Sequence, residues 1–362
     1  MQLTRLRLTD FRCFEALEIN PGPGVNVITG DNASGKTSLL EALYILGRGQ
    51  SFRHATARPA VREGQTAFTV HGLIRSGEQR SRQLAVQRDR RGMHYRCDGN
   101  PSTTRLDLVN AFPLQLIDPN LHRLLEQGPR YRRHFLDWGV FHVEQAFFPA
   151  WHRYRRALRQ RNRALKARWA KKDVIAWDAE LVHNAEIVDA CRRAYIEDIR
   201  RYMPAQAEGL LGEATIAIDY EPGWRHDEGF GAALAAGLDQ DQRMGFTQRG
   251  PHRADLRISV AETTARDWVS RGQQKVLTAA LLIVQARLLH LRRGVQPILL
   301  VDDLAAELGP QYRDGLAAEI AGLGGQCFVT FLEAALVPAA LTPRRLFHVE
   351  QGRVTAHGDD AC

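Results

Sequence analysis

The chain has 362 residues, a net charge of +8 and 44% hydrophobic residues, which indicates a folded, basic protein long enough for two lobes with their own cores. Its five cysteines are scattered and form no C-x-x-C pair, so neither a zinc site nor a disulfide framework is expected. No signal peptide is recognisable, and we expect a cytoplasmic location. The longest apolar stretch, residues 276–284, is too short to cross a bilayer and predicts a buried helix, so no membrane role is expected.

The predicted elements divide the chain into two lobes. Residues 1–118 are rich in strand patterns, at 1–10, 68–74 and 84–86, with one helix. Residues 130–202 contain one proline and have helical spacing throughout, and strands are expected at 215–220 and 256–260. Apolar runs at 298–301 and 327–331 are typical of buried parallel strands. We therefore expect an α/β lobe made of residues 1–118 and 276–362, with a mainly helical lobe, residues 119–275, inserted into it.

Residues 30–37 match the phosphate-binding pattern G-x-x-x-x-G-K-[ST] in its required context. The β-branched run 25–29 predicts a strand before it, and residues 37–46 predict a helix after it, with Gly47 as the expected C-terminal cap. Backbone N–H groups and a helix N-terminus then converge on one anion. This predicts a site for ATP, with Lys36 on the terminal phosphates and Thr37 on Mg²⁺. The nucleotide-binding residues are expected to be Gly30, Asp31, Asn32, Ala33, Ser34, Gly35, Lys36, Thr37 and Ser38.

The predicted strand 298–301 ends in an acidic pair, Asp302 and Asp303. A carboxylate at the carboxyl end of a strand beside a phosphate loop is where Mg²⁺ is held in such folds. We assign Asp302 to the metal through water, because Mg²⁺ keeps much of its hydration shell. Asp303 is then expected to position or activate the attacking water. The alternative is an acidic pair that simply faces solvent at the end of the strand.

Ser270, Gly272 and Gln273 open the helix predicted around residues 276–291 and resemble the S-x-G-Q signature of ATP-binding-cassette ATPases. The resemblance implies that they bind the γ-phosphate of an ATP held by a second subunit; the alternative is an N-capping serine. Gln115 falls where that superfamily places its Mg²⁺-sensing glutamine, although a solvated strand-edge glutamine fits the pattern equally. Arg12, near the end of the first strand, is a candidate contact to the nucleotide base or sugar.

Ten basic residues and no acidic residue lie between Trp151 and Lys172, more positive charge than the net charge of the whole chain. Apolar residues at helical spacing leave the arginines on the exposed faces of a helix. Such a strip predicts contacts to the phosphate backbone of DNA without sequence preference, and a solvated helix face is the alternative. The predicted DNA contacts are Arg153, Arg155, Arg156, Arg159, Arg161 and Arg163.

The chain resembles the RecF family of DNA replication and repair proteins, an SMC-like branch of the ABC-type ATPases, over nearly its whole length. Besides the motifs above, residues 8–12, 39–42, 128–139, 160–162 and 250–256 carry the resemblance. Two positions depart from the family pattern. Ala33 replaces a glycine of the phosphate loop, which is costly only if φ is positive there. Residues 306–309 read Ala-Glu-Leu-Gly where the family tends to have Ser-Glu-Leu-Asp, so hydrolysis or its coupling to dimerisation is expected to be weaker.

The resemblance implies an ABC-type ATPase head that dimerises with ATP around duplex or gapped DNA, hydrolyses ATP slowly as a switch, and works with RecO and RecR to load RecA. Two rival functions remain at the level of sequence. One is a nucleotide-gated scaffold whose basic strip binds an acidic protein. The other is a small-molecule kinase, which the Ser270 signature and the arginine-rich helix disfavour.

Overall fold

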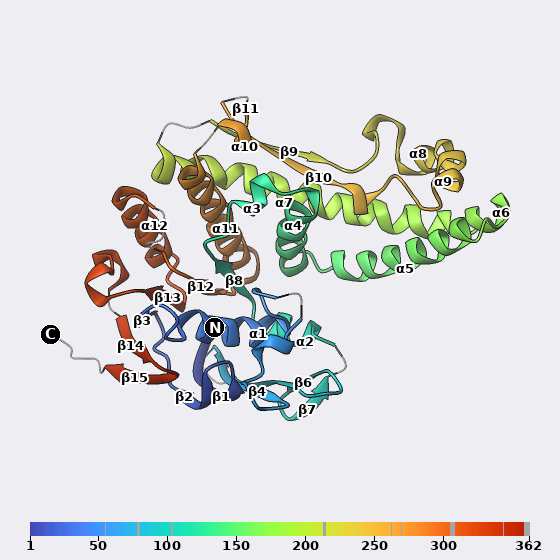
Figure 1. Ribbon diagram of the computed structural model, residues 1–362. Coiled ribbons are helices and arrows are strands. Elements are labelled where there is room, and N and C mark those ends of the chain that lie inside the picture. Colours follow the sequence, from blue (N-terminus) through green and yellow to red (C-terminus); the bar gives the residue numbers. More distant parts are fainter. Residues whose placement is uncertain are drawn as a thin grey trace. The chain divides into compact units, whose positions relative to one another are not determined.

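The structure is a computed structural model, and it describes residues 1–54, 56–77, 80–102, 104–212, 215–261, 263–268, 270–304, 308–342 and 344–357. The chain forms two compact units (Figure 1). Unit 1 comprises residues 1–121 and 289–362, and unit 2 comprises residues 122–288. The sequence-based boundaries were 118/119 and 275/276. The second junction lies inside a helix, Arg271–Arg293, which is continuous across it.

Unit 1 contains two six-stranded sheets. One is antiparallel, in the order β2-β1-β4-β5-β6-β7; the other has the order β15-β14-β3-β13-β12-β8 and is parallel except for β15. The elements are β1 (Gln2–Phe11), β2 (Phe14–Ile19), β3 (Val25–Thr29), α1 (Lys36–Arg48), η1 (Arg58–Ala60), β4 (Phe68–Ser76), β5 (Arg80–Arg88), β6 (Met93–Cys97), β7 (Asn100–Ser102), α2 (Leu106–Ala111), β8 (Leu114–Ile117), β12 (Ile298–Val301), α12 (Pro310–Gly322), β13 (Cys327–Phe331), η4 (Ala334–Leu336), η5 (Ala339–Leu341), β14 (Arg344–Glu350) and β15 (Arg353–His357).

Helix α1 is the centre of unit 1, and its residues 38–47 are all buried. Two glycines let it approach its neighbours: a Cβ on Gly47 would lie 2.3 Å from the Leu114 side chain, and a Cβ on Gly72 of β4 would lie 2.3 Å from that of Leu46. Gly47 is therefore not the helix cap that the sequence suggested. The cap is Gly49, whose φ of 61° is left-handed and whose N–H donates to the Ile45 carbonyl.

Unit 2 is mainly helical, as expected, with a small antiparallel sheet in the order β11-β10-β9. Its long helices α5 and α7 run side by side and form an arm, with α6, α8 and α9 towards its tip (Figure 1). The elements are α3 (Arg123–Glu126), α4 (Pro129–Val143), α5 (Phe147–Lys166), α6 (Lys171–Ile175), α7 (Asp178–Leu211), β9 (Ile216–Glu221), η2 (His226–Glu228), α8 (Phe230–Ala236), α9 (Leu238–Met244), η3 (Pro251–Arg253), β10 (Asp255–Val260), β11 (Thr263–Thr264), α10 (Ala265–Trp268) and α11 (Arg271–Arg293).

Helix α11 is long and apolar enough to cross a membrane by composition. However, 78% of its apolar window is buried inside the protein. Burial of this kind is typical of the core helix of a globular protein, and it agrees with the buried helix predicted around residues 276–284.

Candidate nucleotide site and nucleic-acid interface

The phosphate loop connects β3 to α1 in the arrangement that the sequence predicted. Gly30 has a φ of 147°, and a Cβ there would lie 2.2 Å from the Val349 carbonyl oxygen; Gly35 has a φ of 122°. Both positions therefore require glycine. No side chain caps α1 at Gly35, so the N–H groups of the first helical turn remain available to an anion.

Ala33 adopts a φ of 63°, so its departure from the family glycine falls at a left-handed position. A Cβ in this region costs about 1–2 kcal/mol. The neighbouring Ser34 hydroxyl oxygen is buried and has no hydrogen-bond partner within the described part of the chain. An unsatisfied hydroxyl inside this loop fits a site that is completed by phosphate oxygens.

Lys36 bends back onto the loop. Its Nζ donates hydrogen bonds to the carbonyl oxygens of Gly30, at 2.5 Å, and Asp31, at 2.8 Å. Burial lowers the pKa of the Lys36 amine, against the charges of Asp303, Asp302 and Asp31, which raise it. An anionic phosphate at this position would, like these carboxylates, stabilise the charged form of the Lys36 amine, which fits the predicted role of Lys36.

Asp302 lies directly after β12, and β13 separates that strand from β3. Its Oδ1 accepts hydrogen bonds from the Thr37 hydroxyl, at 3.1 Å, and from the Thr330 hydroxyl, at 3.0 Å. Burial raises the pKa of Asp302 and the charges of Asp303 and Asp118 add to this, against the two hydrogen bonds that lower it. Thr37 and Asp302, 265 positions apart in sequence, are thus in direct contact, so the two residues predicted to hold Mg²⁺ lie together.

This oxygen pair fits Mg²⁺, which prefers hydroxyl, carboxylate and water oxygens. Among the described residues no three His, Cys, Asp or Glu side chains cluster as metal ligands. A magnesium ion here would therefore take its remaining ligands from water and phosphate. Asp303 is exposed beside Asp302, with a φ of 51°, and its N–H donates to the Thr330 hydroxyl at 2.7 Å.

Gln115 is buried in β8, opposite Leu299, so the solvated strand-edge alternative is wrong. It lies three positions before the level of Asp302, about 10 Å along the strand direction at 3.3 Å per residue. Its role as a magnesium sensor stays a prediction. Asp118 instead follows β8 directly, and its charge acts on Asp302. Neither Asp118 nor Thr330, a polar residue in the buried strand β13, was predicted from the sequence.

Arg12 is engaged inside unit 1. Its guanidinium forms two hydrogen bonds of 2.8 Å to the buried Glu41 carboxylate of α1 and one of 2.6 Å to the Pro59 carbonyl. The Ser51 hydroxyl donates to the same carboxylate. Arg12 thus ties the β1–β2 turn to α1, and its contact to a nucleotide base or sugar stays a prediction.

Ser270 and Gln273 form a capping box at the start of α11. The Gln273 N–H donates to the Ser270 hydroxyl at 3.3 Å, and the Ser270 N–H donates to the Gln273 side-chain oxygen at 3.0 Å. The N-capping interpretation of Ser270 is therefore correct as local structure. Ser270 is exposed, and Gly272, in the first turn of the helix, has no side chain that could block access to the backbone. Their role in binding the phosphate of a partner subunit stays a prediction.

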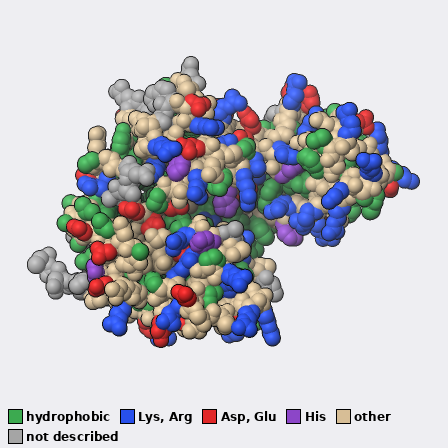
Figure 2. All heavy atoms as spheres, in the orientation of Figure 1, with side chains coloured by type: hydrophobic (Ala, Val, Ile, Leu, Met, Phe, Trp, Pro, Cys, Tyr) green, Lys and Arg blue, Asp and Glu red, His purple; other side chains and the backbone are tan. Residues whose placement is uncertain are grey.

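Helix α5 presents a basic face. Arg153, Arg155, Arg156, Arg159 and Arg163 are exposed. An α-helix turns by about 100° per residue, and on this basis the exposed basic residues from Arg155 to Lys166 fall within an arc of roughly 100° around the axis of α5. They therefore form a stripe along the helix and do not surround it. Figure 2 shows Lys and Arg side chains gathered along the lower side of the arm, where α5 runs in Figure 1.

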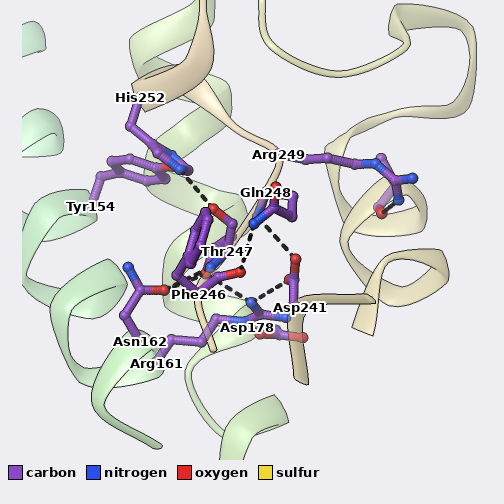
Figure 3. A network of polar contacts seen from close by, with 11 residues as sticks. Tyr154, Arg161, Asn162, Asp178, Asp241, Phe246, Thr247, Gln248, Arg249 and His252 are labelled. Carbon is purple, nitrogen blue, oxygen red and sulfur yellow. Dashed lines mark hydrogen bonds and ion pairs between the residues drawn. The ribbon is translucent and has the colours of Figure 1, made fainter. Parts of the chain in front are cut away.

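Arg161 is the exception, and its assignment as a DNA contact is wrong. The side chain has no exposed surface and is paired with Asp178, at 2.8 Å, and Asp241, at 2.7 Å, while it also donates to the Thr247 hydroxyl (Figure 3). A guanidinium enclosed by two carboxylates cannot reach a DNA phosphate. It lies on the inner face of α5, where charge alone gave no sign of its burial.

Comparison with known proteins identifies the family. The model of the RecF/RecN/SMC N-terminal domain matches residues 2–355. A protein of Azotobacter vinelandii named DNA replication and repair protein RecF is 42% identical over 99% of this chain and 100% of its own length. The protein of that name from Stutzerimonas stutzeri is 41% identical over 99% of this chain and 98% of its own. The chain belongs to the RecF family.

Solved structures agree with this at the level of fold. The recombination mediator protein RecF with ATP, of the RecFOR pathway, superposes with a TM-score of 0.89 at 24% identity, covering 98% of this chain and 99% of that one. An SMC head bound to the C-terminal winged-helix domain of ScpA gives a TM-score of 0.61 at 14% identity, covering 99% and 98%. The ABC-type ATPase head predicted from the sequence is thus confirmed.

Two departures from the RecF pattern were noted in the sequence. Ala33 falls at a positive φ and is strained, as described above. Of the segment 306–309, Ala306 and Glu307 lie outside the described residues. Gly309 has an ordinary φ of −61° and forms the N-cap of α12, so its lack of a side chain is not required by the backbone there.

Proposed function

We propose that this chain is an ATP-dependent DNA clamp of recombinational repair and replication restart. ATP closes two copies on duplex or gapped DNA, and slow hydrolysis releases them. The observation that carries the proposal is the contact of Thr37 with Asp302 at the phosphate loop, in a chain of the RecF family whose arm carries an exposed arginine stripe. By family resemblance, RecO and RecR are the partners with which it helps to load RecA.

Within this proposal the residues of unit 1 hold the triphosphate. Lys36 exchanges its bonds to loop carbonyls for bonds to the terminal phosphates, and the first-turn N–H groups of α1 bind the same anion. Thr37 and Asp302 hold Mg²⁺, which when bound neutralises phosphate charge. Asp303 orients the water. Ser270 and Gly272 of one copy complete the site of the other, so a single copy hydrolyses ATP slowly or not at all.

DNA is held in the proposal by the exposed arginines of α5. Arg155, Arg156, Arg159 and Arg163 lie within nine residues, whose eight steps cover about 12 Å of helix, and carry four charges that bind successive backbone phosphates. Affinity for random-sequence duplex should therefore fall steeply with salt, with a log–log slope of about −0.9 per phosphate contact. A scaffold that binds an acidic protein would not show this salt-dependent affinity for random-sequence duplex.

The proposal is tested by binding to a fluorescent random-sequence duplex at fixed salt with ATP, ADP or no nucleotide. Tight binding only with ATP, steeper than first order in protein, is expected for closing of a dimer. Equal affinity in all three states would contradict the clamp. In parallel, Ser270→Arg should keep ATP binding and lose ATP-driven dimerisation in analytical ultracentrifugation. Normal dimerisation of that variant would disprove the composite site.

A further inference from the structure

A second basic site lies in unit 2, away from the arginine stripe of α5. A surface pocket of about 590 Å³ is lined by Gln127, Gly128, Pro129, Arg130, Tyr131, Arg133 and Arg253. Three of these seven residues are arginines, and none is acidic. Arg130 and Arg133 are three positions apart and share one face of α4, while Arg253 comes from the loop before β10.

The arginines that line this pocket form no ion pair within the described part of the chain. Among the residues that the structure describes, no carboxylate lies within ion-pair distance of Arg130, Arg133 or Arg253. The nearby acids are already engaged. Asp255 forms two hydrogen bonds with Arg132, and Asp137 is paired with the fully buried Arg192. Burial lowers the pKa of Arg133 and the charges of Arg192 and Arg253 add to this, against the charges of Asp255 and Asp137, which raise it.

The loop that carries Arg253 is held in place by buried contacts rather than left free (Figure 3). Asn162 of α5 accepts hydrogen bonds from the Thr247 N–H and hydroxyl, both at 2.8 Å, and Asp241 accepts the Gln248 N–H at 2.9 Å. Arg161 lies between these groups and joins Asp178 to Asp241. The segment 247–248 therefore has a fixed conformation.

His252 extends this support to the residue next to Arg253. Its Nε2 donates to the Thr247 carbonyl at 3.1 Å, so its Nδ1 accepts the Tyr154 hydroxyl proton at 2.6 Å. Burial lowers the pKa of His252 to about 4, so the ring is neutral at physiological pH, as this pattern requires. Gly250 has a φ of 128°, and a Cβ there would lie 2.5 Å from the Tyr154 hydroxyl. Only glycine lets the loop make this turn.

Residues of the blocks 128–139 and 250–256, which the nucleotide site does not use, thus line this pocket, and the block 160–162 supports the loop that leads to Arg253. Arg133 is tied to the same loop, since its Nη1 donates to the Ala254 carbonyl at 2.6 Å. Buried ion pairs contribute little net stability, so we infer that the pairs around Arg161 serve to fix the shape of this loop. That shape places three arginines on the lining of one pocket, with the Arg253 guanidinium 5.4 Å from the centre of the Phe246 ring.

We propose that the pocket formed by Arg130, Arg133 and Arg253 binds a phosphate group, as a site separate from the phosphate loop and from the α5 stripe. Guanidinium groups match phosphate oxygens in geometry and charge. The phosphate belongs either to a nucleic-acid backbone or to a free phosphate compound. Binding of a nucleic-acid phosphate rests on the proposed function, whereas binding of a free phosphate compound does not.

Calorimetry uses the full chain with Lys36→Ala, which weakens phosphate binding at the phosphate loop, whereas duplex binding is measured with Lys36 intact and ATP present. Arg130→Gln is the primary variant, because Arg130 makes no described contact that its loss could disturb. Arg253→Gln is the second variant, checked by thermal melting. Arg225→Gln is the matched control, an exposed arginine of unit 2 that pairs with Asp227 outside the pocket. Two probes are used: a fluorescent random-sequence duplex, and inorganic phosphate followed by calorimetry.

If the pocket binds a backbone phosphate, Arg130→Gln and Arg253→Gln each weaken duplex binding about tenfold and reduce the salt slope by about one, whereas the control does neither. If it binds a free phosphate compound, inorganic phosphate gives a binding isotherm that both variants abolish, while duplex affinity is unchanged. No change with either probe would overturn the proposal. Absence of duplex binding by the unmutated chain would refute the clamp, and the calorimetric result would still decide the pocket.

Discussion

Replacement of Ala33 by glycine should stabilise the protein. Ala33 has a φ of 63°, where a Cβ costs about 1–2 kcal/mol. Glycine removes that strain, although its freedom in the unfolded chain returns about 0.5–1 kcal/mol of the gain. The net stabilisation is then about 0.5–1 kcal/mol. For a unit of this size it corresponds to a rise in melting temperature of about 2 °C.

The assay is differential scanning calorimetry of the nucleotide-free protein, reading the transition that contains unit 1. Ala16→Gly is a matched control, because Ala16 is exposed on β2 and is not among the residues with positive φ. There glycine should lower the melting temperature, since it only adds entropy to the unfolded chain. If Ala33→Gly also lowered the melting temperature, or left it unchanged, the strain assigned to this position would be absent.

Three further outcomes are expected. Asp302→Asn should raise the stability of the nucleotide-free protein at pH 7 and abolish its stabilisation by Mg²⁺-ATP. Because the pKa of Asp302 is raised in the folded state, the protein loses stability as pH rises through that pKa. Asparagine does not ionise, so the variant avoids this loss. Urea unfolding should show Arg161→Met to cost about 3–5 kcal/mol, because two buried carboxylates lose their partner. Arg163→Gln should leave the unfolding free energy within about 0.5 kcal/mol and reduce the salt slope of duplex binding by about one.

The elements around the nucleotide site were predictable because their sequence signals are local. The strand 25–29, the helix after the phosphate loop and the strand 298–301 were all placed correctly, since β-branched runs and helical spacing act over a few residues. Gly47 was misassigned because its reason for being glycine is a contact with Leu114, 67 positions away. Nothing near Gly47 in sequence reports that approach.

The arginines of α5 show a second limit. Arg161 and Arg163 have the same side chain two positions apart, and both were predicted to contact DNA. Two positions in a helix are about 200° apart, so one faces the arm's interior and the other faces solvent. The partners that neutralise Arg161, Asp178 and Asp241, lie on α7 and α9. A run of charged residues in the sequence therefore predicts the sign of the surface charge but not which residues of the run are exposed.

Two residues of the nucleotide site have a strained backbone conformation. Of the eight non-glycine residues with positive φ in the described part of the chain, Ala33 and Asp303 belong to the two motifs of the site itself. Strain of this kind persists only where the surroundings impose it. Because the Ser34 hydroxyl is also left unpaired, the nucleotide-free loop is held in a costly arrangement whose unmet hydrogen bond ATP would supply. Binding of ATP then requires little change in the conformation of the loop. Ala33→Gly should therefore raise the stability of the protein without a matching rise in its affinity for ATP.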